Sequence, residues 1–301
     1  MVDINSNNNF VLSCCSTVDL NLEELNKRDI SYTPFHYFLD NKEYVDDFGK
    51  TMSMKTFYDE MVKGKMTRTS QISVGQYVDY FTSFARVGKD VLHLTLSSGI
   101  SGTLNNAIEA IKEVKKTYPN FKIYVVDSLA ASSGYGLLMV KLSDFKKEGH
   151  SIEETKEYAE KIRLNVNHWF FSTDLTFYIR GGRVSKTSGT IGNMLHICPL
   201  LNVSNEGKLI VREKILGEKK CMLRIVQKMV ENASNGLEYS DYCFISHSDI
   251  LDVANKVKDL IEEKFPHLKR KVKIFDIGTT IGAHTGPGTL ALFFIGNERK
   301  D

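Results

Sequence analysis

One stretch of the chain, residues 91–128, constrains the fold more than any other. It contains an apolar run (VLHLTL), a turn of small residues (SSGISGT), a helix-like segment and a second apolar run (KIYVVDS). In the helix-like segment, apolar residues recur at spacings of four, three and three, as on one face of a helix: Leu104, Ile108, Ile111 and Val114. A strand–helix–strand unit of this kind predicts a parallel sheet.

The same alternation extends through the first half of the chain. We expect a strand at residues 10–14, a hairpin at residues 30–47 that turns near Asp40, and helices at residues 69–88 and 151–166. The capping candidates of the helices are Ser16 and Thr17, Thr69 and Ser70, and Ser151 with Glu154.

The second half reads differently. A hairpin is expected to turn at Ser204–Gly207, and a helix capped by Asp249 lies between later strands. The chain has 301 residues, more than a single core usually holds. The sequence therefore predicts an α/β fold with two domains: a parallel-sheet domain over residues 1–172 and a mixed-sheet domain over residues 173–301.

Composition excludes several classes of protein. Lys plus Arg is 39 and Asp plus Glu is 37, so no basic footprint for nucleic acid is expected. No run approaches the ~20 apolar residues of an integral membrane segment. The five cysteines are scattered without a Cys-x-x-Cys pair, which argues against a disulfide scaffold or a metal site. With no secretory signal in view, we expect a cytoplasmic location.

Hydroxyl-rich segments follow the predicted strands, where ligands bind in open parallel sheets. Each alone can be a helix cap. Together, at helix N-termini, they predict an anion site, because free N–H groups and hydroxyls are hydrogen-bond donors. The residues concerned are Ser16 and Thr17, Thr69 and Ser70, Ser97, Ser98 and Gly99, and Asp127 and Ser128.

Known motifs for other chemistries are missing. There is no phosphate loop of the G-x-x-x-x-G-K-[ST] type and no G-x-S-x-G nucleophile elbow. The segment GPGTLA (286–291) imitates a dinucleotide fingerprint, but the acidic residue needed about 20 positions later would fall beyond residue 301. No cofactor is therefore expected.

Two further segments contain candidate site residues. YIRGGRVS (178–185) places Arg180 and Arg183 around a Gly-Gly turn, which is either a solvated surface turn or part of a site. IGAHTGPGT (281–289) surrounds His284 with glycines, so we expect a loop with a specific backbone path. His284 is either a structural histidine or part of a polar site.

Taken together, these segments resemble the DegV family of bacterial lipid-binding proteins. The resemblance covers nearly the whole chain and keeps the order of the family's segments. The segments are STVD (16–19), EYVDD (43–47), TSQ (69–71), SSGISGT (97–103), VVDS (125–128), YIRGGRVS (178–185) and IGAHTGPGTLAL (281–292).

The resemblance implies two α/β domains with a long-chain fatty acid held between and within them. It implies that hydroxyls of the TSQ and SSGISGT segments hold the carboxylate. The residues implied for the carboxylate are Thr69, Ser70, Ser97 or Ser98, Gly99 and His284. The residues implied to face the head group or a partner are Arg183, Arg180, Thr285 and Gly286.

The best-understood members of this family are binding subunits of fatty acid kinase. They present the carboxylate to a separate kinase, which uses ATP to make an acyl phosphate. The chain departs from the family pattern at Cys15, Ile72 and Leu216, the last replacing an arginine of kinase-partner members. Three hypotheses follow: presentation to a kinase without catalysis by this chain; a carrier or sensor without a kinase, favoured by Leu216; and a stand-alone enzyme using His284 and a serine.

Overall fold

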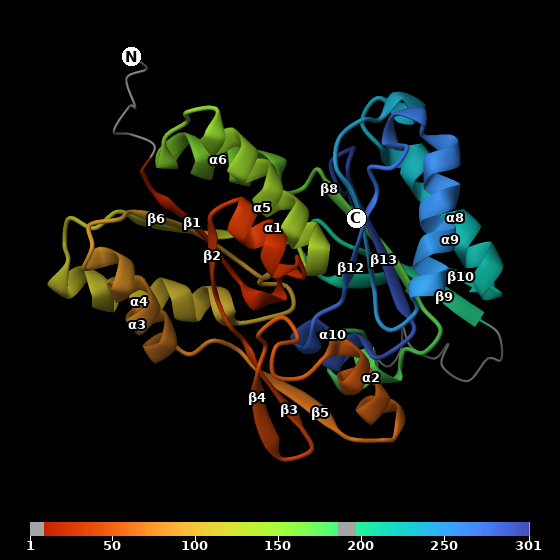
Figure 1. Ribbon diagram of the computed structural model, residues 1–301, viewed down its shortest axis with the longest axis horizontal. Coiled ribbons are helices and arrows are strands. Elements are labelled where there is room, and N and C mark those ends of the chain that lie inside the picture. The colour runs from red at the N-terminus through yellow and green to blue at the C-terminus, as the bar shows by residue number, and fades with distance from the viewer. Residues whose placement is uncertain (1–8, 186–196, 301) are drawn as a thin grey trace.

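The structure is a computed structural model that describes residues 9–185 and 197–300. A four-stranded sheet of the order β2-β1-β6-β7 forms the first half, and all of its strand pairs are parallel (Figure 1). Its strands are β1 (Val11–Cys15), β2 (Ile30–Thr33), β6 (Val91–Thr95) and β7 (Ile123–Asp127).

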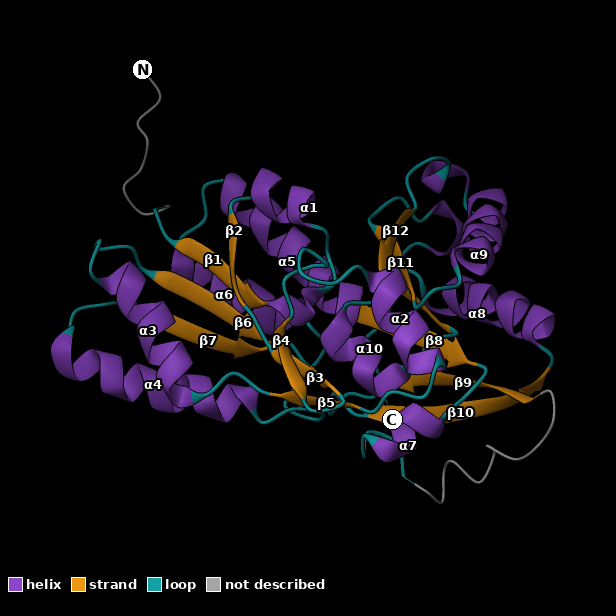
Figure 2. Ribbon diagram, turned by 60° about the horizontal axis from the view of Figure 1, so that its bottom comes forward, coloured by secondary structure: helices purple, strands orange, loops and turns teal. Residues whose placement is uncertain are grey.

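Helices cover both faces of this parallel sheet. Figure 2 shows α3 and α4 on one side and α1, α5 and α6 on the other. Their bounds are α1 (Leu22–Lys27), α3 (Val74–Ala85), α4 (Thr103–Thr117), α5 (Ser132–Lys147) and α6 (Ile152–Ile162). Because apolar residues of both sheet faces are covered, the interior forms a continuous hydrophobic core.

A six-stranded mixed sheet of the order β10-β9-β8-β13-β11-β12 forms most of the second half. Among the described strands of this sheet, only β11 and β12 pair in parallel. The strands are β8 (Val166–Ser172), β9 (Ile197–Val203), β10 (Leu209–Leu216), β11 (Cys243–His247), β12 (Lys273–Asp276) and β13 (Thr289–Ile295). One face packs against α8 (Glu218–Asn232) and α9 (Leu251–Lys264), and α5 packs against β8, β11 and β13.

A small antiparallel sheet of the order β4-β3-β5 lies below the other two in Figure 1. Its strands are β3 (His36–Leu39), β4 (Lys42–Val45) and β5 (Thr67–Ser70). An aromatic cluster of Tyr37, Phe57 and Tyr58 joins it to α2 (Met54–Val62) and to α10 (Thr279–Thr285). The remaining short helices are α7 (Thr176–Arg180), η2 (Ser16–Val18), η3 (Gly236–Glu238) and η4 (Pro266–Leu268).

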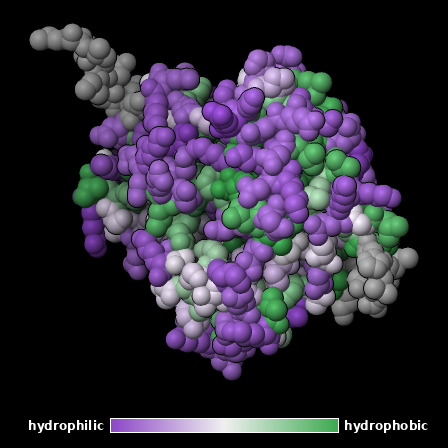
Figure 3. Space-filling view, turned by 45° about the vertical axis from the view of Figure 1, so that its right-hand side comes forward, coloured by the Kyte–Doolittle hydropathy of each residue, from purple (hydrophilic) through white to green (hydrophobic). Residues whose placement is uncertain are grey.

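The surface carries mixed polarity. Hydrophilic side chains cover most of the face in Figure 3, and hydrophobic ones gather in small groups among them. Within residues 9–185 and 197–300, no helix is long and apolar enough to cross a membrane.

The predicted α/β fold with one parallel and one mixed sheet is confirmed. Residues 30–33 of the hairpin predicted over residues 30–47 instead form β2, which pairs in parallel with β1. The turn near Asp40 and the hairpin at Ser204–Gly207 are confirmed. So is the capping box at the start of α6, where the Ser151 hydroxyl accepts from the Glu154 N–H and the Glu154 carboxylate accepts from the Ser151 N–H. These features depend on residues a few positions apart.

Several predicted caps are wrong. Thr69 and Ser70 lie in strand β5, and α3 begins after Ser73, whose hydroxyl accepts from the Gln76 N–H. Thr69 and Ser70 pair with β3, and this strand pairing prevents them from starting the helix. The local sequence pattern contains no sign of the pairing, because β3 is distant in the sequence. Ser16 and Thr17 form the short helix η2 instead of capping α1, and the Asp249 side chain caps nothing at α9.

Two further predictions need correction. His284 lies in the last turn of α10 and not in a loop between strands, although glycines do follow it. On α4 the buried face is shifted, because Ala107 and Ala110 are fully buried while Ile108 is 40% exposed. The small alanines allow α4 to approach the sheet closely.

The predicted domain boundary at Ser172 falls after β8, which belongs to the six-stranded sheet. A division by sheet membership would therefore fall before Val166. The division into two domains stays a prediction, because one hydrophobic core joins residues of both sheets.

Candidate functional site

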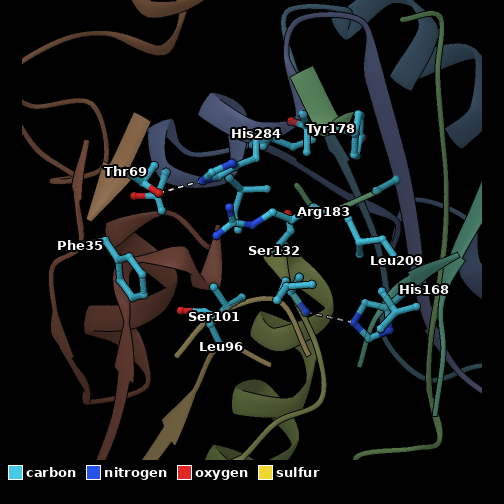
Figure 4. Close-up of a pocket in the computed structure, with 18 of the residues that line it drawn as sticks. Phe35, Thr69, Leu96, Ser101, Ser132, His168, Tyr178, Arg183, Leu209 and His284 are labelled. Atoms are coloured by element: carbon cyan, nitrogen blue, oxygen red, sulfur yellow. Dashed lines mark hydrogen bonds between the residues drawn. The ribbon is translucent and has the colours of Figure 1, made fainter. Parts of the chain in front are cut away.

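A cavity of about 680 Å³ lies where the three sheets meet (Figure 4). Segments from along the whole chain line it: β5, the loop after β6, the start of α5, strands β8, β9, β10 and β13, and helix α10. Its size falls in the ~300–1,000 Å³ range of ligand pockets.

Most of the cavity wall is apolar. Strands of the six-stranded sheet supply one side, and the loop after β6 and the segment before β3 supply the other. The main apolar lining residues are Phe35, Leu96, Phe170, Val203, Leu209, Ala291 and Phe293. Such a wall can bury an extended apolar group without any directional contact.

One end of the cavity is polar. Thr69 projects from β5 and His284 from the last turn of α10, and Thr69 Oγ1 lies 2.7 Å from His284 Nε2. Figure 4 shows the Arg183 side chain directed toward the same place. A strand, a helix and the Gly-Gly turn thus bring together Thr69, His284 and Arg183, which are far apart in the sequence.

The electrostatics of this end favour an anion. Burial and the neighbouring Arg183 lower the pKa of His284 to about 4, so its ring is neutral at pH 7. Burial also lowers the pKa of Arg183. Its Nη1 donates to the Gly181 carbonyl, and in the part of the chain that the structure describes no carboxylate pairs with it. A half-buried guanidinium without a counter-ion is suited to receive one.

Gly181, two residues before Arg183, lies directly against the His284 ring. A Cβ on Gly181 would lie 2.4 Å from His284 Nδ1, closer than any real side chain allows. The glycine therefore permits the turn to approach the His284 ring.

The SSGISGT segment divides into a lining part and a supporting part. Ser98, Ser101 and Gly102 line the cavity. The buried Ser97 hydroxyl instead donates to the Gly207 carbonyl at 2.8 Å and accepts from the Gly99 N–H at 3.1 Å. Ser97 thus joins this segment to the β9–β10 hairpin.

Two helix amino ends also face the cavity. α4 begins after Gly102 and α5 after Ala131, and neither of these two residues supplies a side-chain cap, although the Ser101 hydroxyl accepts from the Thr103 N–H at 3.3 Å. Gly102 and Ala131 both line the cavity. The positive ends of the two helix dipoles add to the preference for an anion.

Some of the other predicted site residues line the cavity and others do not. Ser70 and Thr285 line the cavity. Gly99 packs against the backbone of the hairpin turn, and Gly286, with φ of 71°, packs against the Phe177 ring. Arg180 is exposed and covers the Phe177 ring, so it does not line the cavity.

The remaining hydroxyl-rich loops do not reach the cavity either. The Ser16 hydroxyl donates to Asp46, and Thr17 is fully buried. Asp127 accepts from the Ser98 N–H at 3.1 Å, and Ser128 accepts from a backbone N–H in its own turn. Asp127 therefore supports the lining loop, while the STVD segment belongs to a different polar cluster.

Sequence reasoning missed Gln71, Ser132 and His168 as cavity residues. Gln71 follows Thr69 and Ser70 and was open to prediction from the TSQ segment. His168 Nδ1 donates to the Val166 carbonyl at 2.9 Å, and its Nε2 accepts from the Ala131 N–H at 3.4 Å. Burial lowers the pKa of His168 far below the usual range. Its strand is mostly apolar, so the sequence gives no local signal that His168 lines a cavity.

Within the described residues, no group of three or more His, Cys, Asp or Glu side chains could hold a metal ion. The arrangement can instead hold an anionic head group at one end and a long apolar group along the walls.

Comparison with known proteins identifies related chains. Residues 15–297 match the family model described as "Uncharacterised protein, DegV family". A DegV domain-containing protein of Clostridium perfringens is 35% identical over 291 residues, which cover 97% of this chain and 99% of that protein.

Solved structures agree with this match. A DegV lipid binding protein from Thermotoga maritima has a TM-score of 0.82 at 26% identity, covering 97% of this chain and 99% of that one. A fatty acid binding DegV family protein from Streptococcus agalactiae has a TM-score of 0.82 at 25% identity, covering 96% and 99%.

Proposed function

This chain belongs to the DegV family, and on that premise we propose that it binds a long-chain fatty acid in the cavity. The carboxylate lies at the polar end, beside Thr69, Arg183 and His284. The acyl chain lies along the apolar walls. The fatty-acid-binding and lipid-binding relatives support this assignment.

One observation carries the proposal. The Arg183 guanidinium lines the polar end of a mostly apolar cavity, and no described carboxylate neutralises it. A fatty acid supplies the missing anion and the apolar tail in one molecule. Burial of methylene groups is worth ~0.8 kcal/mol each, so about 14 of them give roughly 11 kcal/mol before the ~4–15 kcal/mol cost of association. The polar contacts therefore decide whether binding is tight.

Two measurements test the proposal. Lipid extracted from the purified protein should contain long-chain fatty acids by mass spectrometry. Delipidated protein should bind palmitate more tightly than the alcohol of the same chain length, because only palmitate carries a charge for Arg183.

Matched arginine variants sharpen the test. Arg183→Gln should weaken palmitate binding by roughly 10- to 150-fold, the loss of a hydrogen bond to a charged group. Arg180→Gln removes a nearby arginine that does not line the cavity and should leave affinity unchanged. No extracted fatty acid together with no palmitate binding, or equal affinities of the two variants, would refute the proposal.

The proposal extends to presentation of the carboxylate to a separate ATP-dependent kinase, with this chain as a non-catalytic subunit in the cytoplasm. The polar end of the cavity reaches the surface, since Gln71, Ser98 and Gly102 are exposed. A partner could therefore approach the carboxylate from this side. The five unpaired cysteines fit a reducing compartment.

A carrier or sensor role without a kinase remains the alternative that Leu216 favours. Leu216 is 62% exposed at the end of β10, and Leu209, which lines the cavity, begins that strand. The two residues are therefore about 20 Å apart along the strand. Leu216 itself does not line the cavity.

Acyl phosphate formation separates the three hypotheses. The protein is mixed with ATP and palmitate, with and without a fatty acid kinase catalytic subunit, and the product is trapped with hydroxylamine. Product only with the kinase supports presentation. No product in either mixture supports a carrier or sensor, and product without the kinase supports a stand-alone enzyme.

A further inference from the structure

A second polar cluster lies behind the cavity, at the amino end of α10. Asp19 follows η2 and Asp46 follows β4, and these residues are only 4% and 2% exposed. Both approach Gly278, the residue that precedes α10. In the part of the chain described here, neither carboxyl group has a basic partner.

Asp19 connects two helix ends that border the cavity. Its Oδ1 accepts a hydrogen bond from the Gly278 N–H at 3.0 Å, and its Oδ2 accepts one from the Ser132 hydroxyl at 2.5 Å. Ser132 is the first residue of α5 and lines the cavity. Because each oxygen holds a different helix end, Asp19 fixes the spacing between α5 and α10.

Asp46 supports the same end of α10. Its Oδ2 accepts from the Ser16 hydroxyl at 3.1 Å, and the Thr280 N–H favours its charged form. A Cβ on Gly278 would lie 2.6 Å from Asp19 Oδ1 and 3.8 Å from Asp46 Oδ1. A glycine at this position therefore lets both carboxyl groups approach the helix.

Backbone strain gathers at the same contact. Asp19 and Ser132 both adopt the left-handed region, with φ of 45° and 53°. This region is unfavourable for residues with a Cβ, and such strain persists where surrounding contacts hold it, often near functional sites. The hydrogen bond between these two side chains is one such contact.

We propose that Asp19 and Asp46 are positioning residues that hold α10 so that His284 faces the head group. The inference rests on the proposed function. α10 has seven residues, so the carboxyl pair and His284 lie about 10 Å apart at opposite ends of the helix. The pair therefore acts through the helix and not by contact with the ligand.

The burial of the two carboxyl groups changes the pH at which they bind a proton. Burial raises the pKa of both carboxyl groups, and for Asp19 the nearby Asp46 and Asp276 raise it further. Tyr58, which donates to the Ile277 carbonyl at 2.8 Å, is a further titratable group at this place, and burial and Asp46 also raise the pKa of Tyr37. Two carboxyl groups this close bind a proton at higher pH than exposed aspartates do.

The test compares Asp19→Ala with Thr155→Ala. Thr155 is a fully buried hydroxyl on α6 that bonds within its own helix and lies outside the cavity lining. Both variants are expected to lower the melting temperature. Only Asp19→Ala should weaken palmitate binding, by about tenfold, on the scale of one lost bond to a charged group.

The titration of His284 in ligand-free protein, followed by NMR of its ring, separates positioning from direct charge effects. Release of α10 should expose the ring, so its pKa should rise from about 4 toward its ordinary value. Loss of any negative charge that the pair carries, about 10 Å away, would by itself lower that pKa. A pKa that stays or falls in Asp19→Ala therefore overturns the inference.

Asp19→Asn keeps the experiment decisive if Asp19→Ala fails to fold. The amide oxygen can accept from the Gly278 N–H and the amide nitrogen can donate to Ser132, so affinity and the His284 pKa should stay close to wild type. Gly278→Ala should reproduce the rise in the His284 pKa, because its Cβ would collide with Asp19. An unchanged pKa in Gly278→Ala overturns the inference. Wild-type protein that fails to bind palmitate counts against the proposed function alone, since the His284 titration needs no ligand.

Discussion

Thr69 and Ser97 are both hydroxyl residues of segments expected to hold a carboxylate, yet they occupy different surroundings. Thr69 lines the cavity and contacts His284. Ser97 is fully buried and bonds to the hairpin turn. Replacing each hydroxyl should therefore change a different property of the protein.

Thr69→Val keeps the β-branched shape that suits a strand and removes the hydroxyl. If this hydroxyl donates to the carboxylate, its loss costs about 1.5–3 kcal/mol, or roughly 10- to 150-fold in palmitate affinity. The melting temperature of ligand-free protein should fall less than in Ser97→Ala, because the lost bond to His284 is only partly buried and valine is a good strand residue.

Ser97→Ala is the matched comparison. It leaves the Gly207 carbonyl and the Gly99 N–H without their partner, and each such buried group costs about 1–3 kcal/mol. The melting temperature should fall clearly, while palmitate affinity measured below the transition should stay within about threefold of wild type.

The assays are calorimetric titration of delipidated protein with palmitate and thermal unfolding of the same samples. The reasoning is refuted if Thr69→Val binds palmitate like wild type. It is equally refuted if Ser97→Ala loses affinity by tenfold or more at an unchanged melting temperature, because Ser97 would then contact the ligand.

Three further predictions concern the same cavity. Burial and Arg183 hold the pKa of His284 at about 4 in the folded protein, whereas an unfolded histidine titrates at about 6.5. Between these pH values the unfolded state binds a proton that the folded state does not. The free energy of unfolding should therefore fall by up to about 3 kcal/mol as the pH drops through this window. His284→Gln should flatten that part of the pH profile in urea unfolding, and an unchanged slope would contradict the assignment. Gly181→Ala should displace the His284 ring and weaken palmitate binding, whereas Gly75→Ala, with open space around it, should not; equal titration curves would argue against the contact. Ala291→Leu adds bulk to the apolar wall, so the ratio of C12 to C18 fatty acid affinity should rise, and a constant ratio would place the acyl chain elsewhere.

The sequence alone determined the features that depend on neighbouring residues. The period of the segment after the SSGISGT turn predicts α4, and the Ser151–Glu154 spacing predicts the start of α6. The hydrogen bonds involved join residues three or four positions apart, so local composition suffices to specify them. The hairpin turn at Gly207, with φ of 73°, is local in the same way.

The family-like segments also predict residues that lie at the polar end of the cavity. Thr69, Arg183 and His284 were all candidates from their sequence segments, and all three line the cavity. Sequence could not separate Ser98, which lines it, from Ser97, which does not, because adjacent residues differ only in the direction of their side chains.

Only the tertiary structure decided which elements carry these residues and what surrounds them. Thr69 lies in a strand because it pairs with Tyr37 of β3, and its hydroxyl meets His284, 215 positions along the chain. The absence of a described carboxylate beside Arg183, and the position of Asp19 between two helix ends, likewise depend on distant segments. Such contacts form only when the whole chain has closed around its core, and no local period or spacing encodes them.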